Sequence, residues 1–252
     1  MMRTLKSLPA DFDSAYGVGE LARKIQQQGT LELTGLPGSS KALFLASLLQ
    51  GLDRGILLVT RNNREAADLI TDLSQFTEDT VHLVAAKETL PYDDTPPAAD
   101  SLMRRVRALY ALVRGQKALV VVPVRAFLDY LTPSRVLRRA LVRLASGDTI
   151  KPGNLAKKLA VLGYERTERV SAPGAFSVRG DILDVFANGL EHPVRIEFFD
   201  DTIEELRFFS PLTQRSTEPV DELTVLPVTD LIVDREVRDR LEELRNDQNG
   251  EL

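Results

Sequence analysis

Alternating apolar and polar positions predict short β-strands between Pro173 and Phe209. Side chains on a strand point to opposite faces in turn, so the segment VRIEFF has an apolar face and a mixed face. The apolar face carries Val194, Ile196 and Phe198, and the mixed face carries Arg195, Glu197 and Phe199. Arginine and phenylalanine are enriched at the centres of binding surfaces. The pattern therefore indicates a small sheet with one face suited to binding.

The preceding segment, AFSVRGDILDVF, is interpreted as one strand of the same sheet, and IEELRFF as another. In that interpretation Phe176, Val178 and Ile182 lie on the core side, and Arg179 and Asp181 lie on the other side. If the strands pair, Arg179 lies beside the face of Arg195. An alternative stays open, in which a second apolar layer buries Phe199 and both arginines are ordinary solvated or ion-paired residues.

The first half of the chain alternates strands and helices, which is typical of a parallel sheet covered by helices. Strands are expected at residues 55–60, 80–84 and 118–123, the first of them buried, and helices at residues 19–28, 64–75 and 100–113. A further strand, Thr30–Thr34, is expected to enter a glycine turn and a helix that ends at Gly51. This α/β domain is expected to span residues 1–133, with a proline-rich loop at residues 90–100.

The rhythm changes after Pro133. A strand at residues 136–144, a helix at residues 152–163 and the three strands described above predict a separate α+β domain over residues 134–211. The chain then has a short apolar run at residues 223–226 and an expected helix at residues 231–245. A length of 252 residues with 43% hydrophobic content is sufficient for two such packing units.

The segment GLPGSSKA stands where a nucleoside-triphosphate loop would lie, between an expected strand and a helix. Gly35, Gly38 and Lys41 are in register with the pattern GxxxxGK followed by Ser or Thr. Ser40 replaces the second glycine, and Ala42 replaces the hydroxyl that would hold Mg²⁺. We therefore interpret these five residues as a degenerate phosphate loop without ATP hydrolysis. Weak anion binding at the helix N-terminus stays open.

Composition excludes several kinds of site. The chain has no cysteine, which excludes disulfides, a thiolate nucleophile and a cysteine-ligated metal. Its two histidines, His82 and His192, are far apart in the sequence, so no metal site is expected. We find no signal-peptide core and no apolar run of the roughly 18 residues that a membrane helix needs, so a soluble, cytoplasmic protein is expected.

Charge is unevenly distributed along the chain. The net charge of −5 argues against a general nucleic-acid coat. Residues 104–143 nevertheless carry ten lysines and arginines and a single acid, Asp129. No interleaved aromatic pattern supports single-strand binding there. We interpret this basic stretch as an internal electrostatic partner or a solvated face.

Several motifs follow one another in a distinctive order, namely GLPGSSKA, LPYD, VVVPVRAFL, AFSVRGDILDVF, VRIEFFDDTIEELRFF and SPLTQRS. This order resembles the module shared by the nucleotide-excision repair protein UvrB and the bacterial transcription-repair coupling factors. The most specific part is RGDILDVF followed by RIEFFDD. UvrB has an intact phosphate loop and a long DNA-clamping β-hairpin, for which the few residues between Tyr92 and Asp100 leave no room. The chain is therefore more similar to the amino-terminal part of the coupling factors.

The resemblance implies an inactive ATPase-like, P-loop-type first domain, an inserted UvrA-binding second domain, and a return of residues 212–252 to the first domain. It also implies that UvrA contacts fall on Arg179, Arg195 and Phe199, which strand parity places on one face. No cofactor is expected for this chain, because ATP and Mg²⁺ would bind motor domains of a longer translocase that also binds RNA polymerase and double-stranded DNA. A monomer is expected. Two alternatives are a UvrB-like DNA-binding repair subunit and a nucleotide-binding ATPase domain.

Overall fold

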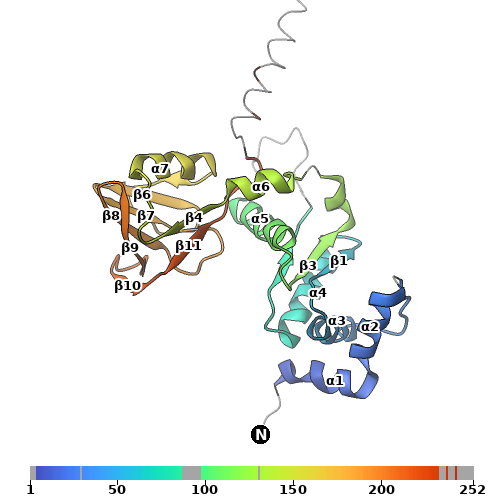
Figure 1. Cartoon of the computed structure of the whole chain (residues 1–252). Helices are drawn as coiled ribbons and strands as arrows, with labels where there is room; N and C mark the ends of the chain where they lie inside the picture. Colours follow the sequence, from blue (N-terminus) through green and yellow to red (C-terminus); the bar gives the residue numbers. More distant parts are fainter. Residues whose placement is uncertain are drawn as a thin grey trace, which may run out of the picture. The chain divides into compact units, whose positions relative to one another are not determined.

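The computed structural model describes residues 4–28, 30–86, 98–129 and 131–232, together with residues 237 and 242. The chain divides into two compact units, Met1–Tyr130 and Leu131–Leu252 (Figure 1). No helix in these described ranges is long and apolar enough to cross a membrane. The LPYD motif and most of the helix expected at residues 231–245 lie outside the described residues.

The first unit is an α/β structure with a small parallel sheet. Its strands have the order β1-β3-β2, and both neighbouring pairs are parallel. The strands are β1 (Ile56–Thr60), β2 (Val81–Leu83) and β3 (Leu119–Pro123). The helices are α1 (Leu8–Tyr16), α2 (Val18–Gln28), α3 (Ser40–Gly51), α4 (Asn63–Phe76) and α5 (Ala99–Arg114), with 3₁₀ turns η1 (Leu5–Ser7) and η2 (Val124–Leu128). The predicted alternation of strands and helices is confirmed for these three strands and for α2 to α5.

The central strand β3 is buried along its whole length because helices cover both of its faces. On one face, Leu119 clusters with Leu49 of α3 and Leu73 of α4. On the other face, Val120 and Val122 cluster with Ala108 of α5. The continuous apolar sequence of β3 therefore corresponds to its central position in the sheet.

Two predictions for the first unit are wrong. Residues 30–37 form neither strand nor helix, so the strand expected at Thr30–Thr34 is absent. A strand needs a neighbour to satisfy its amides and carbonyls, and β1 pairs with β3 but with no segment of residues 30–37. Strand β1 was expected to be buried, but it exposes Leu57 and Val59. It is an edge strand of the described sheet, and one of its faces is left uncovered there.

The second unit contains a six-stranded sheet and a two-stranded ribbon (Figure 1). The large sheet has the order β10-β9-β8-β7-β6-β5, antiparallel except for the parallel pair β5–β6. Its strands are β5 (Glu165–Arg166), β6 (Ala175–Arg179), β7 (Ile182–Val185), β8 (Val194–Phe199), β9 (Thr202–Phe209) and β10 (Ser216–Pro219). The ribbon pairs β4 (Val142–Ala145) with β11 (Glu222–Val225), and the helices are α6 (Ser134–Ala140) and α7 (Pro152–Val161). This mixed β-sheet unit, separate from the parallel sheet, confirms the expected α+β character.

The start of the second unit differs from the prediction. A strand was expected at residues 136–144, but the structure has helix α6 followed by the shorter strand β4. The segment after Pro133 is rich in arginine, leucine and alanine, which favour a helix. The segment buries two consecutive residues, Val136 and Leu137. A strand with one solvent-exposed face would bury only one of two consecutive residues, because its side chains alternate between the faces.

Residues 212–228 pack with the second unit. Strand β10 pairs with β9, and β11 pairs with β4. The buried Tyr164 hydroxyl donates a hydrogen bond to the Leu226 carbonyl at 2.7 Å and accepts one from the Asn188 amide at 3.0 Å. Burial raises the pKa of Tyr164, so its hydroxyl stays protonated as a donor. The expected return of residues 212–252 to the first domain is left as a prediction for the residues beyond these contacts.

Candidate protein-binding surface

Strand β8 separates core residues from surface residues as its alternation predicts. Val194, Ile196 and Phe198 are buried, and Phe198 is 5% exposed. Phe199, the next residue, is 73% exposed. The part of the alternative in which a second apolar layer buries Phe199 is therefore wrong, whereas both arginines are ion-paired as that alternative expected.

The segment AFSVRGDILDVF forms a hairpin of two strands rather than one strand. Gly180 has a φ of +59°, which an L-residue with a side chain rarely adopts, and the chain reverses there. Register pairs Arg179 with Ile182 and Phe176 with Val185. Directly paired residues share a face, so Ile182 lies on the face of Arg179 and not on the core side. The sequence-based assignment of Ile182 is corrected accordingly.

The hairpin places β7 between the two strands that carry the arginines. β8 pairs with β7, and β7 pairs with β6, so Arg179 and Arg195 are not on adjacent strands. Asp184 of β7 pairs directly with Arg195 of β8 and with Ser177 of β6. Its carboxylate therefore lies between the two guanidinium groups on the same face of the sheet.

Asp184 forms ion pairs with both arginines, although its side chain is only 1% exposed. The Arg195 Nε donates to Asp184 Oδ1 at 2.8 Å, and the Arg195 Nη2 donates to Asp184 Oδ2 at 3.0 Å. The Arg179 Nη2 donates to the same Oδ2 at 2.8 Å. Charged donors and a bidentate geometry make these strong hydrogen bonds. We call Arg179, Asp184, Arg195 and Phe199 the arginine face.

Arg195 is the more enclosed of the two arginines. Its guanidinium carbon lies 5.0 Å from the centroid of the Phe209 ring, a distance typical of a cation–π contact. Its Nη1 donates to the Gln214 carbonyl at 3.4 Å. The hydrogen bond to the Asp184 carboxylate raises the pKa of Arg195, against the opposing effect of burial. Arg195 is therefore a fixed cation with its donors directed at protein groups.

Arg179 and Phe199 are the members of this face that remain available to a partner. The Arg179 side chain is 53% exposed, compared with 16% for Arg195. Arg179 uses one nitrogen for Asp184, so the remaining guanidinium donors are open to solvent. The assignment of Arg179, Arg195 and Phe199 as contact residues stays a prediction, since it concerns a partner.

Asp184 was not among the residues predicted for this face from the sequence. The residue was hidden because residues 175–186 were interpreted as a single strand, which left no separate β7 between the arginines. The signal was present in the dipeptide Gly180–Asp181, a glycine-containing pair typical of a two-residue hairpin turn. A two-residue turn at Gly180–Asp181 pairs Arg179 with Ile182, and the same register pairs Ser177 with Asp184. This register places an acid diagonally across from Arg179.

The degenerate phosphate loop also has a defined geometry. Gly35 and Gly38 have φ angles of +80° and +54°, and helix α3 begins at Ser40. The Ser40 amide donates to the Pro37 carbonyl at 3.3 Å, and the Ser40 hydroxyl donates to the same carbonyl at 2.6 Å. Ala42 is fully buried in a cluster with Leu49, Leu73 and Leu119. The position that would hold a metal-binding hydroxyl is thus an apolar core position, while Lys41 is exposed.

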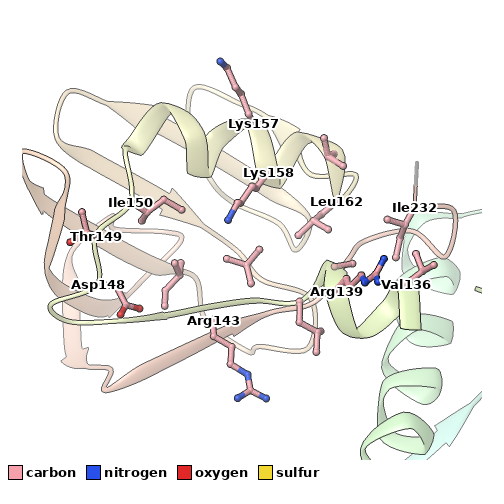
Figure 2. A pocket seen from close by; sticks show the side chains of 15 residues that line it. Val136, Arg139, Arg143, Asp148, Thr149, Ile150, Lys157, Lys158, Leu162 and Ile232 are labelled. Atoms are coloured by element: carbon pink, nitrogen blue, oxygen red, sulfur yellow. The ribbon is translucent and has the colours of Figure 1, made fainter. Parts of the chain in front are cut away.

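A cavity of about 640 Å³ lies in the second unit, where α6, α7 and β4 contribute to its lining (Figure 2). Val136, Leu162 and Ile232 supply buried apolar surface. In Figure 2 the Lys158 side chain extends from α7 toward β4, whereas Lys157 points away. The lining contains no histidine, cysteine or glutamate, and its one acid, Asp148, accepts a hydrogen bond from the Ala145 amide at 2.8 Å.

No cluster of three or more metal-ligating residues occurs in the described part of the chain. The basic stretch at residues 104–143 contains an internal ion pair. The single acid of the basic stretch, Asp129, pairs with the buried Arg105 at 3.1 Å. Arg105 also donates to the Ala85 carbonyl at 2.9 Å. The ion pair joins two residues of the basic stretch itself, so the interpretations of the stretch as an electrostatic partner or a solvated face stay predictions.

Comparison with known proteins identifies the relatives of this chain. Residues 142–231 match the family model of the UvrB interaction domain, which covers the mixed sheet and the arginine face. The chain is 34% identical over 209 residues to the transcription-repair-coupling factor of Bacillus subtilis (strain 168) and 37% identical over 217 residues to that of Myxococcus xanthus. It is homologous to the transcription-repair-coupling factors.

The coupling-factor similarity extends beyond the matched domain. The comparison covers 82% of this chain for the Bacillus subtilis and Myxococcus xanthus proteins. For the Staphylococcus aureus (strain USA300) coupling factor the identity is 32% over 225 residues, which is 89% of this chain. The chain spans 18% or 19% of the length of these relatives, so it corresponds to a small part of a coupling factor.

Proposed function

We propose that this chain is a protein-recruitment module that binds the repair protein UvrA through the arginine face. The observation that carries the proposal is the exposure of Phe199 on the same sheet face as the buried Arg195–Asp184 pair. An exposed phenylalanine and an arginine on one face of the same strand are residue types enriched at the centre of a protein interface. The homology to coupling factors and the match to the UvrB interaction domain support the same assignment.

The chemistry of the arginine face suits a protein partner better than a small molecule. Phe199 lines none of the four cavities described in this chain, and Arg179 lines one of about 400 Å³. An exposed phenyl ring instead fills an apolar pocket on a partner, and a guanidinium fork binds a carboxylate of the partner through two parallel hydrogen bonds. We therefore infer that UvrA presents an apolar pocket and an adjacent carboxylate to this face.

In the longer protein, this module would bring UvrA to RNA polymerase stalled at a DNA lesion. The chain spans about a fifth of the coupling factors that it matches. The ATP-dependent motor and the surfaces for RNA polymerase and double-stranded DNA would then belong to the rest of that cytoplasmic protein. The net charge of −5 supports recruitment over DNA binding as the role of this part.

The test is a titration of purified UvrA with the whole chain, measured by calorimetry. We expect saturable binding by the wild-type chain and weaker binding by Arg179→Ala, since truncation removes the exposed donors of the face. Arg143→Ala is the matched control, because Arg143 is an exposed arginine of strand β4, which is not part of the six-stranded sheet. A wild-type chain that shows no heat of binding at tens of micromolar would refute the recruitment proposal.

The alternative ATPase function leads to a separate prediction. We expect no magnesium-dependent ATP hydrolysis by this chain, because the buried Ala42 has no hydroxyl to bind the metal. The measurement is phosphate release by the wild type and by Lys41→Ala. Lys41 is exposed, and its ammonium group is the cation of this loop that could bind a phosphate. Turnover that disappears in Lys41→Ala would contradict this prediction and favour the ATPase alternative.

A further inference from the structure

We propose that Asp184 is the positioning residue of the arginine face, holding Arg195 as a fixed support and orienting Arg179 for the direct ionic contact with the partner. This inference rests on the proposed UvrA-binding function and adds a division of labour between the two arginines. It assigns Arg195 a supporting role, although strand parity treats the two arginines alike. The assignment follows from where each guanidinium directs its donors.

The Arg195 guanidinium is committed to the protein. Two of its three nitrogens donate to Asp184, at 2.8 and 3.0 Å, and the third donates to the Gln214 carbonyl at 3.4 Å. The guanidinium group also lies over the ring of Phe209, which is itself buried. A partner could bind Arg195 strongly only by displacing these groups. Displacement would leave the buried Asp184 carboxylate without its bidentate partner, which is costly.

The Arg179 guanidinium is anchored at one point and otherwise open. Its Nη2 donates to Asp184 Oδ2 at 2.8 Å, while its side chain is 53% exposed. A single strong hydrogen bond to a buried carboxylate restricts a long side chain that would otherwise sample many rotamers. Restriction before binding reduces the ordering penalty that association must overcome. Asp184 therefore prepares Arg179 for a partner carboxylate.

The charges of the group agree with this division. Two guanidinium cations share one carboxylate, so the group keeps one net positive charge. Because Arg195 satisfies both carboxylate oxygens, the uncompensated charge lies toward the exposed Arg179. The register extends this surface from Arg179 through Ile182 to Glu197, two residues before Phe199 on β8. The partner that fits is a protein surface with one carboxylate near an apolar pocket.

The experiment measures UvrA affinity for Asp184→Asn, which keeps the shape of the side chain but removes its charge. We expect a roughly three- to tenfold loss of affinity, the range that corresponds to ordering one long side chain on association. Asp181→Asn is the matched control, because Asp181 is exposed in the adjacent turn, and it should bind like the wild type. Wild-type affinity in Asp184→Asn would overturn the inference while leaving UvrA recruitment intact.

A double-mutant cycle separates positioning from a general effect on the fold. If Asp184 acts through Arg179, Asp184→Asn should cost less than about twofold when Arg179 is already alanine. An equal loss in both backgrounds would show that Asp184 does not act through Arg179 and would overturn the inference. A wild-type chain that does not bind UvrA would instead refute the proposed function, and the inference with it.

Salt dependence provides a second readout that requires no change at Asp184. Ionic strength screens a direct contact between Arg179 and a partner carboxylate. Arg179→Ala should therefore flatten the dependence of the dissociation constant on salt, whereas Arg195→Lys should leave the slope unchanged. Lysine keeps the charge of Arg195 but loses its fork geometry. A flattened slope in Arg195→Lys, or an unchanged slope in Arg179→Ala, would overturn the inference even if Asp184→Asn failed to fold.

Discussion

Replacing Phe199 by alanine is expected to weaken UvrA binding about thirtyfold and to leave the stability of the second unit unchanged. A buried aromatic anchor at the centre of an interface typically costs about 2 kcal/mol or more when truncated. That free energy corresponds to roughly a thirtyfold change in the dissociation constant. Phe199 is 73% exposed in the free chain, so its truncation leaves no internal cavity. Calorimetric titration and thermal unfolding of the same variant measure both effects.

The neighbouring residue provides the matched control. Phe198 has the same side chain on the opposite face of β8 and is only 5% exposed. Phe198→Ala should lower the free energy of unfolding by about 3–5 kcal/mol, as core truncations of phenylalanine do. If Phe199→Ala unfolds the second unit, or if it binds UvrA as well as the wild type does, the arginine face is not the recruitment surface.

The second large effect concerns the core beneath the arginine face. Ile196→Ala is expected to lower the free energy of unfolding of the second unit by about 2–5 kcal/mol. Ile196 is fully buried and lies in register between Leu183 of β7 and Leu206 of β9, both of which are also buried. Removing its side chain creates a cavity that the paired strands cannot close without disrupting the ladder.

Urea unfolding of the whole chain, followed by the amide resonances of Leu183 and Leu206, measures this loss for the second unit alone. Glu197→Ala is the control, because Glu197 is the next residue and points to the other face of β8. Its effect should stay within about 0.5 kcal/mol. An Ile196→Ala variant as stable as Glu197→Ala would contradict the assignment of Ile196 to the core.

Local patterns in the sequence were sufficient for most of the individual elements. The continuous apolar run of β3 and the helical spacing of α4 and α5 identify elements whose burial is imposed by their own periodicity. The predictions failed for segments whose secondary structure depends on pairing or packing with another segment. Residues 30–34 alternate like a strand but have no pairing partner in the described sheet. The segment after Pro133 buries its apolar residues as a helix.

The arginine face divides in the same way. Alternation along β8 predicted that Arg195 and Phe199 lie on one face of the strand and Ile196 on the other face. This prediction needs only the geometry of a single strand. The face on which Ile182 lies and the position of Asp184 beside Arg179 could not be predicted from one strand. Both depend on the chain reversal at Gly180.

The amino-acid sequence alone specifies which residues of each strand share a face and that the residue after Lys41, Ala42, has no hydroxyl. Both are properties of neighbouring residues, and the covalent chain imposes them. The position of β7 between the two arginine-bearing strands, and the burial of Asp184 between their guanidinium groups, are properties of the folded sheet. The strand order and the burial of Asp184 depend on contacts between residues separated by turns, because hydrogen bonds across strands, and not periodicity along them, set which side chains meet.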